Sequence, residues 1–235
     1  MDEKEKNAIR EKFKRRKAAP LVYRFVIDGF DEIEDFNRFM KTAIRREKHL
    51  TSEHLDEGAE GLEGEALQQY WEIFAEDYQI IGSVFEKFAL DSFIVMLYSR
   101  LESGMATLCD AMRQDKQNEK GEMIGLRYTD LRGSGYLDQA RFYMEKVIGL
   151  NLDLGNNPQW PEIIALRALR NAIVHEEGWL STKDATLKKH IKQGLLELSN
   201  QKEENGQISG WVTVTTEYID FVLPLIRTFF QNLKI

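Results

Sequence analysis

Apolar residues recur at every third or fourth position over most of this chain, the spacing that places them on one face of a helix. The spacing predicts helices over residues 31–50, 65–82, 83–114, 136–150, 161–177, 183–195 and 216–233. Asp31 suits the N-cap of the first, and residues 21–27 alternate loosely enough to be a strand or a helix start. The pattern therefore predicts an all-α protein.

A different pattern appears near the C-terminus, where polar and apolar residues alternate. Residues 196–199 and 207–213 flank the dipeptide Asn205-Gly206, and Asn-Gly between alternating segments is a strong signal for a β-hairpin. We therefore expect a helical bundle with one small β-hairpin, followed by a last helix that Pro224 should kink.

The composition changes between Glu53 and Glu65, where acidic residues alternate with Gly58, Gly61 and Gly64. Each glycine weakens a helix by about 1 kcal/mol relative to alanine, so this stretch is predicted to be a linker. The linker would end an N-terminal appendage of residues 1–60, made of a charged arm and an amphipathic helix. It would separate that appendage from a helical domain of residues 61–235.

The overall composition is that of a soluble globular protein, since 43% of the 235 residues are hydrophobic and 30% are charged. The longest apolar run, Phe93–Tyr98, is too short to span a bilayer, and the charged N-terminus lacks the apolar core of a secretory signal. The single cysteine, Cys109, excludes an intramolecular disulfide, and its apolar helical setting favours packing over nucleophilic chemistry. We expect a cytoplasmic protein without a membrane segment.

The formal net charge of −7 limits how this protein can bind nucleic acid. An acidic protein does not attract phosphates with its whole surface, so an RNA contact needs a local cationic site. The basic cluster Lys12–Lys17 is either a solvated helix face or an arm that contacts RNA or a partner. The long polar connection of residues 114–135 offers weaker candidates for substrate contact, namely Arg127, Tyr128 and Arg132.

The helix predicted over residues 161–177 has two distinct faces when its side chains are placed at 100° intervals. One is a core-facing stripe of Ala165, Leu166, Leu169, Ala172 and Ile173. The opposite face carries Arg167, Asn171 and His175, with Arg170 at its border and the aliphatic residues Ile164, Ala168 and Val174 in between. A face that mixes such polar anchors with aliphatics is typical of an interface, so we expect a homodimer whose two-fold axis joins two copies.

Arg170, Asn171 and His175 are the residue types that metal-free RNA cleavage needs. An imidazole exchanges a proton near neutral pH, and a guanidinium presents a planar fork to phosphate oxygens. Asn171 either orients the His175 ring or donates to a phosphate. The other histidines lack metal-ligand spacing, so we expect neither a metal nor another cofactor. Motifs of serine hydrolases, zinc proteases and phosphate-binding loops do not occur in the sequence.

The segment Arg170-Asn-Ala-Ile-Val-His175, late in an apolar helix, resembles the hallmark of the HEPN superfamily. The resemblance covers roughly residues 65–235, including Glu102, which looks like the acidic position on an earlier helix, and the final helix after Val212–Thr215. It implies a helical bundle, obligate dimerisation and a composite ribonuclease site in which Arg170 and His175 are catalytic. It further implies a toxin or phage-defence effector with an RNA substrate and an antitoxin or other regulatory protein as partner.

Two functions remain open. The first is the ribonuclease, with Arg170, Asn171 and His175 catalytic and with Glu102 and Arg167 in support. The second is a non-catalytic HEPN-type module that binds RNA or nucleotide or serves as a dimerising scaffold, which the acidic balance favours. In that case His175 only caps the helix dipole and Arg170 pairs with Glu102. Arg170 and His175 lie about 140° apart on an ideal helix, so a shared site is expected to need the dimer or a distorted last turn.

Overall fold

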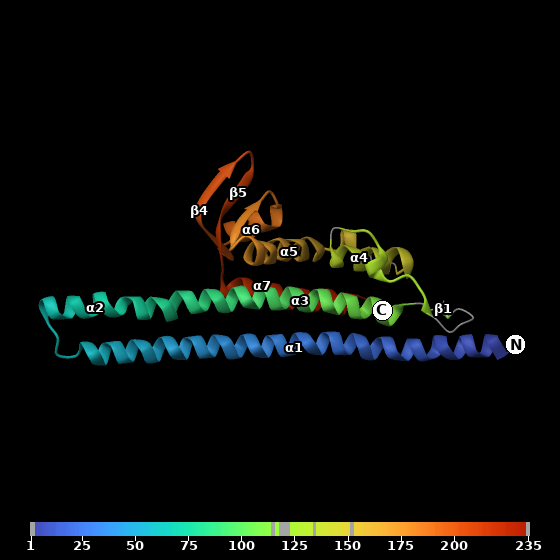
Figure 1. Cartoon of the computed structure of the whole chain (residues 1–235), viewed down its shortest axis with the longest axis horizontal. Helices are drawn as coiled ribbons and strands as arrows, with labels where there is room; N and C mark the ends of the chain where they lie inside the picture. Colours follow the sequence, from blue (N-terminus) through green and yellow to red (C-terminus); the bar gives the residue numbers. More distant parts are fainter. Residues whose placement is uncertain (1–2, 114–115, 118–122, 134, 151–152, 234–235) are drawn as a thin grey trace. The chain divides into compact units, whose positions relative to one another are not determined.

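The structure is a computed structural model that describes residues 3–113, 116–117, 123–133, 135–150 and 153–233. Helices make up most of the described chain (Figure 1). In order, the elements are α1 (Glu3–Ala59), α2 (Gly64–Gln79), the π-helix η1 (Ile80–Phe85), α3 (Glu86–Met112), β1 (Lys116–Gln117), β2 (Met123–Ile124), the 3-10 helix η2 (Tyr128–Asp130), α4 (Tyr136–Phe142), the π-helix η3 (Tyr143–Val147), the 3-10 helix η4 (Leu154–Asn156), α5 (Trp160–His175), β3 (Trp179–Thr182), α6 (Ala185–Lys192), β4 (Leu196–Glu204), β5 (Gln207–Val214) and α7 (Thr216–Asn232).

The predicted helices are confirmed, although several begin or end elsewhere. Helix α1 absorbs both the ambiguous residues 21–27 and the helix expected over 31–50, so the predicted N-cap at Asp31 is wrong. The expected break at Gly82–Ser83 is also wrong, because the π-helix η1 joins α2 to α3 without a turn. The basic cluster Lys12–Lys17 belongs to α1, and its side chains lie outside the described residues.

The predicted acidic linker is mostly helix. Helix α1 continues to Ala59, and only Glu60–Glu63 separates it from α2. A Cβ at Gly58 would lie 2.2 Å from the hydroxyl oxygen of Tyr70, so this glycine makes room for a ring instead of breaking the helix. Gly61 and Gly64 do form the turn, since their φ angles of 80° and 58° belong to the left-handed region that favours glycine.

The chain divides into two compact units that do not follow a boundary at residue 60. The first unit comprises Met1–Glu32, Leu97–Arg167 and Phe221–Ile235, and the second comprises Ile33–Met96 and Ala168–Asp220. The division into an appendage of residues 1–60 and a helical domain of residues 61–235 stays a prediction. Among the described helices, none has both the length and the apolar character that a membrane crossing requires.

Aromatic side chains form the centre of the first unit. The ring of Phe30 on α1 lies 5.2 Å, centroid to centroid, from that of Phe230 on α7, and Phe229 lies 6.1 Å from Trp160 at the start of α5. The hydroxyl of Tyr23 donates to the carbonyl oxygen of Phe230 at 2.7 Å. These contacts join α1, α5 and α7 within this unit.

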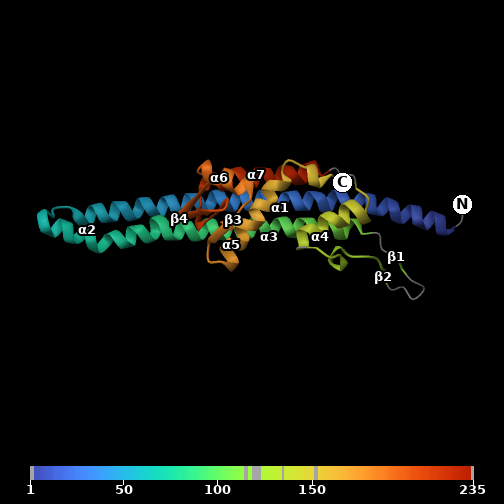
Figure 2. The same cartoon turned by 90° about the horizontal axis from the view of Figure 1, so that it is seen from above.

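In the second unit, α1 from Ile33 onward and α2 lie side by side as an antiparallel hairpin (Figures 1 and 2). Lys48 of α1 forms an ion pair with Glu86 of α3 at 2.5 Å. The hydroxyl of Tyr70 donates to the carbonyl oxygen of Leu55 at 3.1 Å. These polar contacts join α1 to α2 and to α3 within the second unit.

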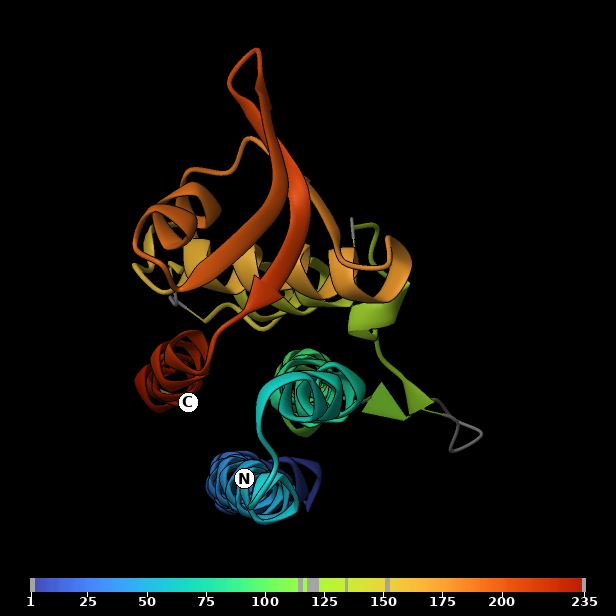
Figure 3. The ribbon, with the colours of Figure 1, turned by 90° about the vertical axis from the view of Figure 1, so that its left-hand side faces the viewer.

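The second unit also contains an antiparallel sheet with the strand order β3-β5-β4. The predicted hairpin is confirmed as β4 and β5, which extend beyond β3 and α6 in Figure 3. The third strand, β3, was not predicted, because four residues directly after a helix give too little alternation to recognise. The expected mostly helical class is confirmed, and the sheet near the C-terminus has three strands where one hairpin was expected.

We expect Gly104→Ala to destabilise the protein. A Cβ at Gly104 would lie 2.9 Å from both Phe230 Cζ and Val26 Cγ1, which are buried in the first unit. Overpacking a core costs about 1–3 kcal/mol, which should exceed the roughly 1 kcal/mol that a helix gains from glycine to alanine. Urea unfolding measures the change. Gly82→Ala is the matched control, since its nearest neighbour would be 3.9 Å away, and an equal or greater loss there would contradict the prediction.

We expect acid to destabilise the protein through His190 of α6. The residue is 1% exposed and its ring packs against Tyr218, and burial lowers the pKa of the imidazole to about 4, with the charge of Lys189 adding to the effect. Because the unfolded state takes up the proton first, stability is intact above pH ~6.5 and falls as the pH decreases toward 4, by about 3 kcal/mol.

Urea unfolding at pH 7 and pH 4 tests this expectation. His190→Phe should lose that part of the pH dependence, whereas His49→Phe, at an exposed histidine of α1, should keep it. The same pH dependence in wild type and His190→Phe would show that His190 does not carry the effect.

Candidate active site

Helix α5 presents the candidate catalytic residues, and its ends follow from local sequence. Pro161 occupies the first turn, where its missing N–H costs no helical hydrogen bond. The helix ends at His175, because Glu177 and Gly178 adopt the left-handed region with φ angles of 52° and 89°. The N–H of Gly178 donates back to the carbonyl oxygen of Ala172 at 2.8 Å and closes the last turn.

The two faces of α5 are confirmed. Four residues of the predicted core stripe are buried, since Ala165, Leu166, Leu169 and Ala172 are at most 5% exposed. Ile173, at the end of the stripe, is half-buried. On the other side, Asn171 and His175 are exposed and Arg170 is half-buried. The core contact therefore orients the helix so that the polar residues reach solvent.

Arg170, Asn171 and His175 form one hydrogen-bonded cluster within a single chain. The Nη1 atom of Arg170 lies 3.1 Å from His175 Nε2 and 3.1 Å from Asn171 Oδ1. The long arginine side chain thus spans the angle of about 140° that separates the two residues on the helix. Neither a second subunit nor a distorted turn is needed to bring the two side chains together, contrary to the expectation from the helix geometry.

Which atom donates in this contact depends on the tautomer of His175. A guanidinium has only donors, so Nε2 accepts from Arg170 when His175 is neutral and its proton is on Nδ1. Nη1 carries two hydrogens, one for Nε2 and one for the Asn171 amide oxygen. Asn171 therefore accepts a hydrogen bond from the guanidinium, and its expected roles toward the ring or a phosphate stay predictions.

The two predicted supporting residues belong to the first unit. Arg167 forms an ion pair with Asp138 of α4 at 2.8 Å, with both side chains about three-quarters buried, so its guanidinium connects α5 to α4. Glu102 is half-buried on α3, and its charge contributes to the raised pKa of Tyr128. Orientation of Arg170 by Glu102 stays a prediction.

Arg127 and Tyr128, two of the weaker candidates, line a polar cavity of about 340 Å³ in the first unit. The cavity is also lined by Asp110 of α3 and by Arg113 directly after α3, which the sequence analysis missed because both precede the polar connection of residues 114–135. Burial, followed by the charge of Asp110, raises the pKa of Tyr128. Arg132, the third candidate, is exposed. Among the described residues, those that line this cavity do not include Arg132.

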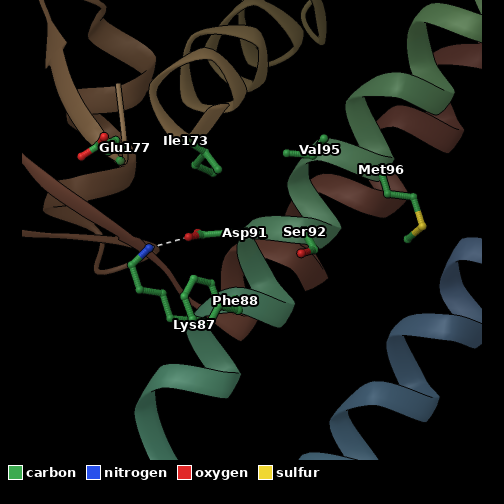
Figure 4. Close-up of a pocket in the computed structure, with 9 residues that line it drawn as sticks. Lys87, Phe88, Asp91, Ser92, Val95, Met96, Ile173 and Glu177 are labelled. Atoms are coloured by element: carbon green, nitrogen blue, oxygen red, sulfur yellow. Dashed lines mark hydrogen bonds and ion pairs between the residues drawn. The ribbon is translucent and has the colours of Figure 1, made fainter. Parts of the chain in front are cut away.

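A larger cavity of about 580 Å³ lies in the second unit between α3 and the end of α5 (Figure 4). Its wall is mainly apolar, with Phe88, Val95 and Ile173, and the ion pair of Lys87 with Asp91 lies at one side. Its size suits a small apolar group. The described residues that line this cavity include neither Arg170 nor His175.

Within the described residues, no three His, Cys, Asp or Glu side chains are grouped so that they could hold a metal ion. Comparisons with protein-family models, with curated proteins and with solved structures find no match to this chain. The resemblance to the HEPN superfamily therefore stays a prediction that rests on the residues around Arg170.

We expect Cys109 to be unreactive in the folded protein. The residue is 1% exposed and its thiol lies 3.7 Å from the carbonyl oxygen of Ala140. Burial, with a contribution from Asp110, raises the pKa of the thiol to about 12, so the nucleophilic thiolate is scarce at neutral pH. Labelling with a thiol reagent should be slow in buffer and rapid in urea, and rapid labelling of the folded protein would overturn the expectation.

Proposed function

We propose that this protein is a metal-independent endoribonuclease of the HEPN type, with Arg170 and His175 as its catalytic pair. The 3.1 Å contact between Arg170 Nη1 and His175 Nε2 carries this proposal, because it places a phosphate-binding cation and a proton acceptor together at an exposed helix end.

The chemistry follows from the neutral imidazole. A substrate phosphate attracts the Arg170 guanidinium and releases Nε2 of His175, which then accepts the proton of the adjacent ribose 2′-hydroxyl. The 2′-oxygen bonds to phosphorus, the bond from phosphorus to the 5′-oxygen breaks, and the imidazolium returns its proton to that 5′-oxygen. The products are a 2′,3′-cyclic phosphate and a 5′-hydroxyl, and no metal ion takes part.

The proposal includes a homodimer in the cytoplasm that acts on RNA as a toxin or phage-defence effector under the control of an antitoxin or another regulator. Val174, next to His175 on α5, is 44% exposed, and an exposed aliphatic residue beside a polar cluster supports a subunit contact there. Because Arg170 and His175 already meet in one chain, the dimer would position RNA across two sites and would not assemble each site.

We expect His175→Ala and Arg170→Lys each to lower RNA cleavage by about 10²–10⁴-fold, because each removes an interaction made in the transition state. Lysine should not replace Arg170, since an ammonium lacks the bidentate fork. Asn171→Ala should fall between these variants and wild type. Cleavage is measured with purified protein in excess EDTA, and the termini of the products are identified by mass spectrometry.

His49→Ala, at an exposed histidine of α1, is the matched control and should cleave like wild type. Cleavage by His175→Ala within a few-fold of wild type would assign the cluster a structural role and favour the scaffold function. Activity that EDTA abolishes and Mg²⁺ restores would reject the metal-independent mechanism.

We expect Val174→Glu to dissociate the dimer, because it would bury two like charges at the axis at a cost of several kcal/mol. Light scattering should give twice the chain mass of 27.4 kDa for wild type and the single mass for the variant. Val147→Glu is the control, at a valine of similar exposure in the first unit, and should remain dimeric. A monomeric wild type at micromolar concentration would refute the dimer.

A further inference from the structure

Two tryptophans lie on the solvent side of the sheet in the second unit. Trp179 of β3 and Trp211 of β5 are directly paired across the strands, with ring centroids 5.3 Å apart and planes at 79°. Trp211 is 40% exposed, whereas its neighbours Val212 and Gly210 face the buried side. The indole rings therefore do not belong to the core that the other face of the sheet forms.

Polar side chains surround this pair on the same face. Alternate residues of a strand share a face, and so do directly paired residues of neighbouring strands. The open face accordingly carries Ser181, Glu197, Ser199, Lys202, Glu204, Gln207, Ser209 and Thr213 around the two indoles. Gln207 Nε2 donates to Ser181 Oγ at 2.6 Å, which leaves the Gln207 amide oxygen able to accept from a ligand.

The sheet is tied to the end of α5 by backbone hydrogen bonds. The N–H of Trp179 donates to the carbonyl oxygen of Glu176 at 2.8 Å, and that of Val212 donates to the carbonyl oxygen of Gly178 at 2.9 Å. Trp179 follows His175 by four residues, so their Cα atoms cannot be more than about 14 Å apart. The indole pair and the Arg170–His175 cluster are therefore held within a few nucleotides of each other.

The local charge also suits RNA better than the charge of the whole chain. Residues 168–214 contain six cations (Arg170, Lys183, Lys188, Lys189, Lys192 and Lys202) and six anions (Glu176, Glu177, Asp184, Glu197, Glu203 and Glu204), a net charge of zero. The whole chain has a net charge of −7. Repulsion of phosphates by the segment that holds both the indole pair and the catalytic pair is thus weaker than the net charge of the whole chain implies.

We infer that the open face of the β3-β5-β4 sheet, centred on Trp179 and Trp211, is a stacking platform for the bases of single-stranded RNA. Exposed aromatic rings bind bases of any sequence through their π faces, and the surrounding hydroxyl and amide groups contact base edges. This inference deepens the proposed ribonuclease function and rests on it for the substrate class. It adds that the enzyme selects unpaired RNA, because a paired base has no free face for the platform.

The test uses the full-length protein and a 2′-O-methyl RNA decamer, which lacks the nucleophilic hydroxyl and cannot be cleaved. Binding to wild type should quench tryptophan fluorescence. Trp211→Ala should raise the Kd by about 5- to 150-fold, the effect expected for loss of one stacked base, and Trp211→Phe should restore part of the affinity. Trp71→Ala is the matched control, at a tryptophan of similar exposure on α2, and should bind like wild type.

An abasic decamer of the same length separates stacking from phosphate binding, and wild type and Trp211→Ala should bind it equally. A Kd for the 2′-O-methyl decamer that Trp211→Ala leaves within twofold of wild type would overturn the platform, as would an equal loss of affinity for the abasic strand. Failure of the proposed function gives a different result. If the protein binds the decamer through Trp211 but does not cleave ordinary RNA, the platform is supported and the nuclease function is refuted.

Discussion

The closure of α5 at Gly178 is the constraint on which the candidate site depends. Gly178 holds a φ angle of 89°, which lets its N–H turn back to Ala172 while its carbonyl oxygen accepts from Val212 of β5. One residue therefore ends the helix after His175 and anchors the sheet that follows. A residue with a Cβ would be strained in this conformation, so the positions of His175 and Trp179 depend on the absence of a side chain at Gly178.

In the candidate site on α5, one guanidinium contacts both of the other polar residues. The guanidinium of Arg170 lies 3.1 Å from both the imidazole of His175 and the amide oxygen of Asn171, so it joins the two residues. In the proposed mechanism a phosphate competes for that cation, and binding of substrate is what frees the proton acceptor. Such an arrangement couples the availability of the base to the presence of the anion on which it acts, and it needs no movement of the backbone.

The proposed function requires local attraction of RNA by an acidic protein, and the charges are unevenly distributed along this chain. The segment from Ala168 to Val214 is neutral, so the net charge of −7 is carried by the rest of the chain. Stacking on Trp179 and Trp211 does not require net positive charge, since a π face interacts with an uncharged base. Affinity from aromatic rings and one guanidinium would be weaker than affinity from a basic groove, and it would favour release of cleaved product.

The sequence by itself determined the features that depend on neighbours along the chain. The 3.6-residue period of α5 placed Leu169 and Ala172 in the core and His175 in solvent, and the dipeptide Asn205-Gly206 located the β4–β5 turn. Period and turn chemistry are local, and therefore a single sequence carries them.

Contacts between distant residues were decided only by the tertiary structure. Gly58 looked like a helix breaker until Tyr70, twelve residues later, proved to occupy the space beside it, and β3 was too short to recognise until β5 paired with it. The meeting of Arg170 with His175 depended on the rotamers of a long side chain, which helix geometry alone does not specify. Helix positions give the directions of Cβ atoms, whereas a site is made by the ends of side chains, and those ends are placed by packing.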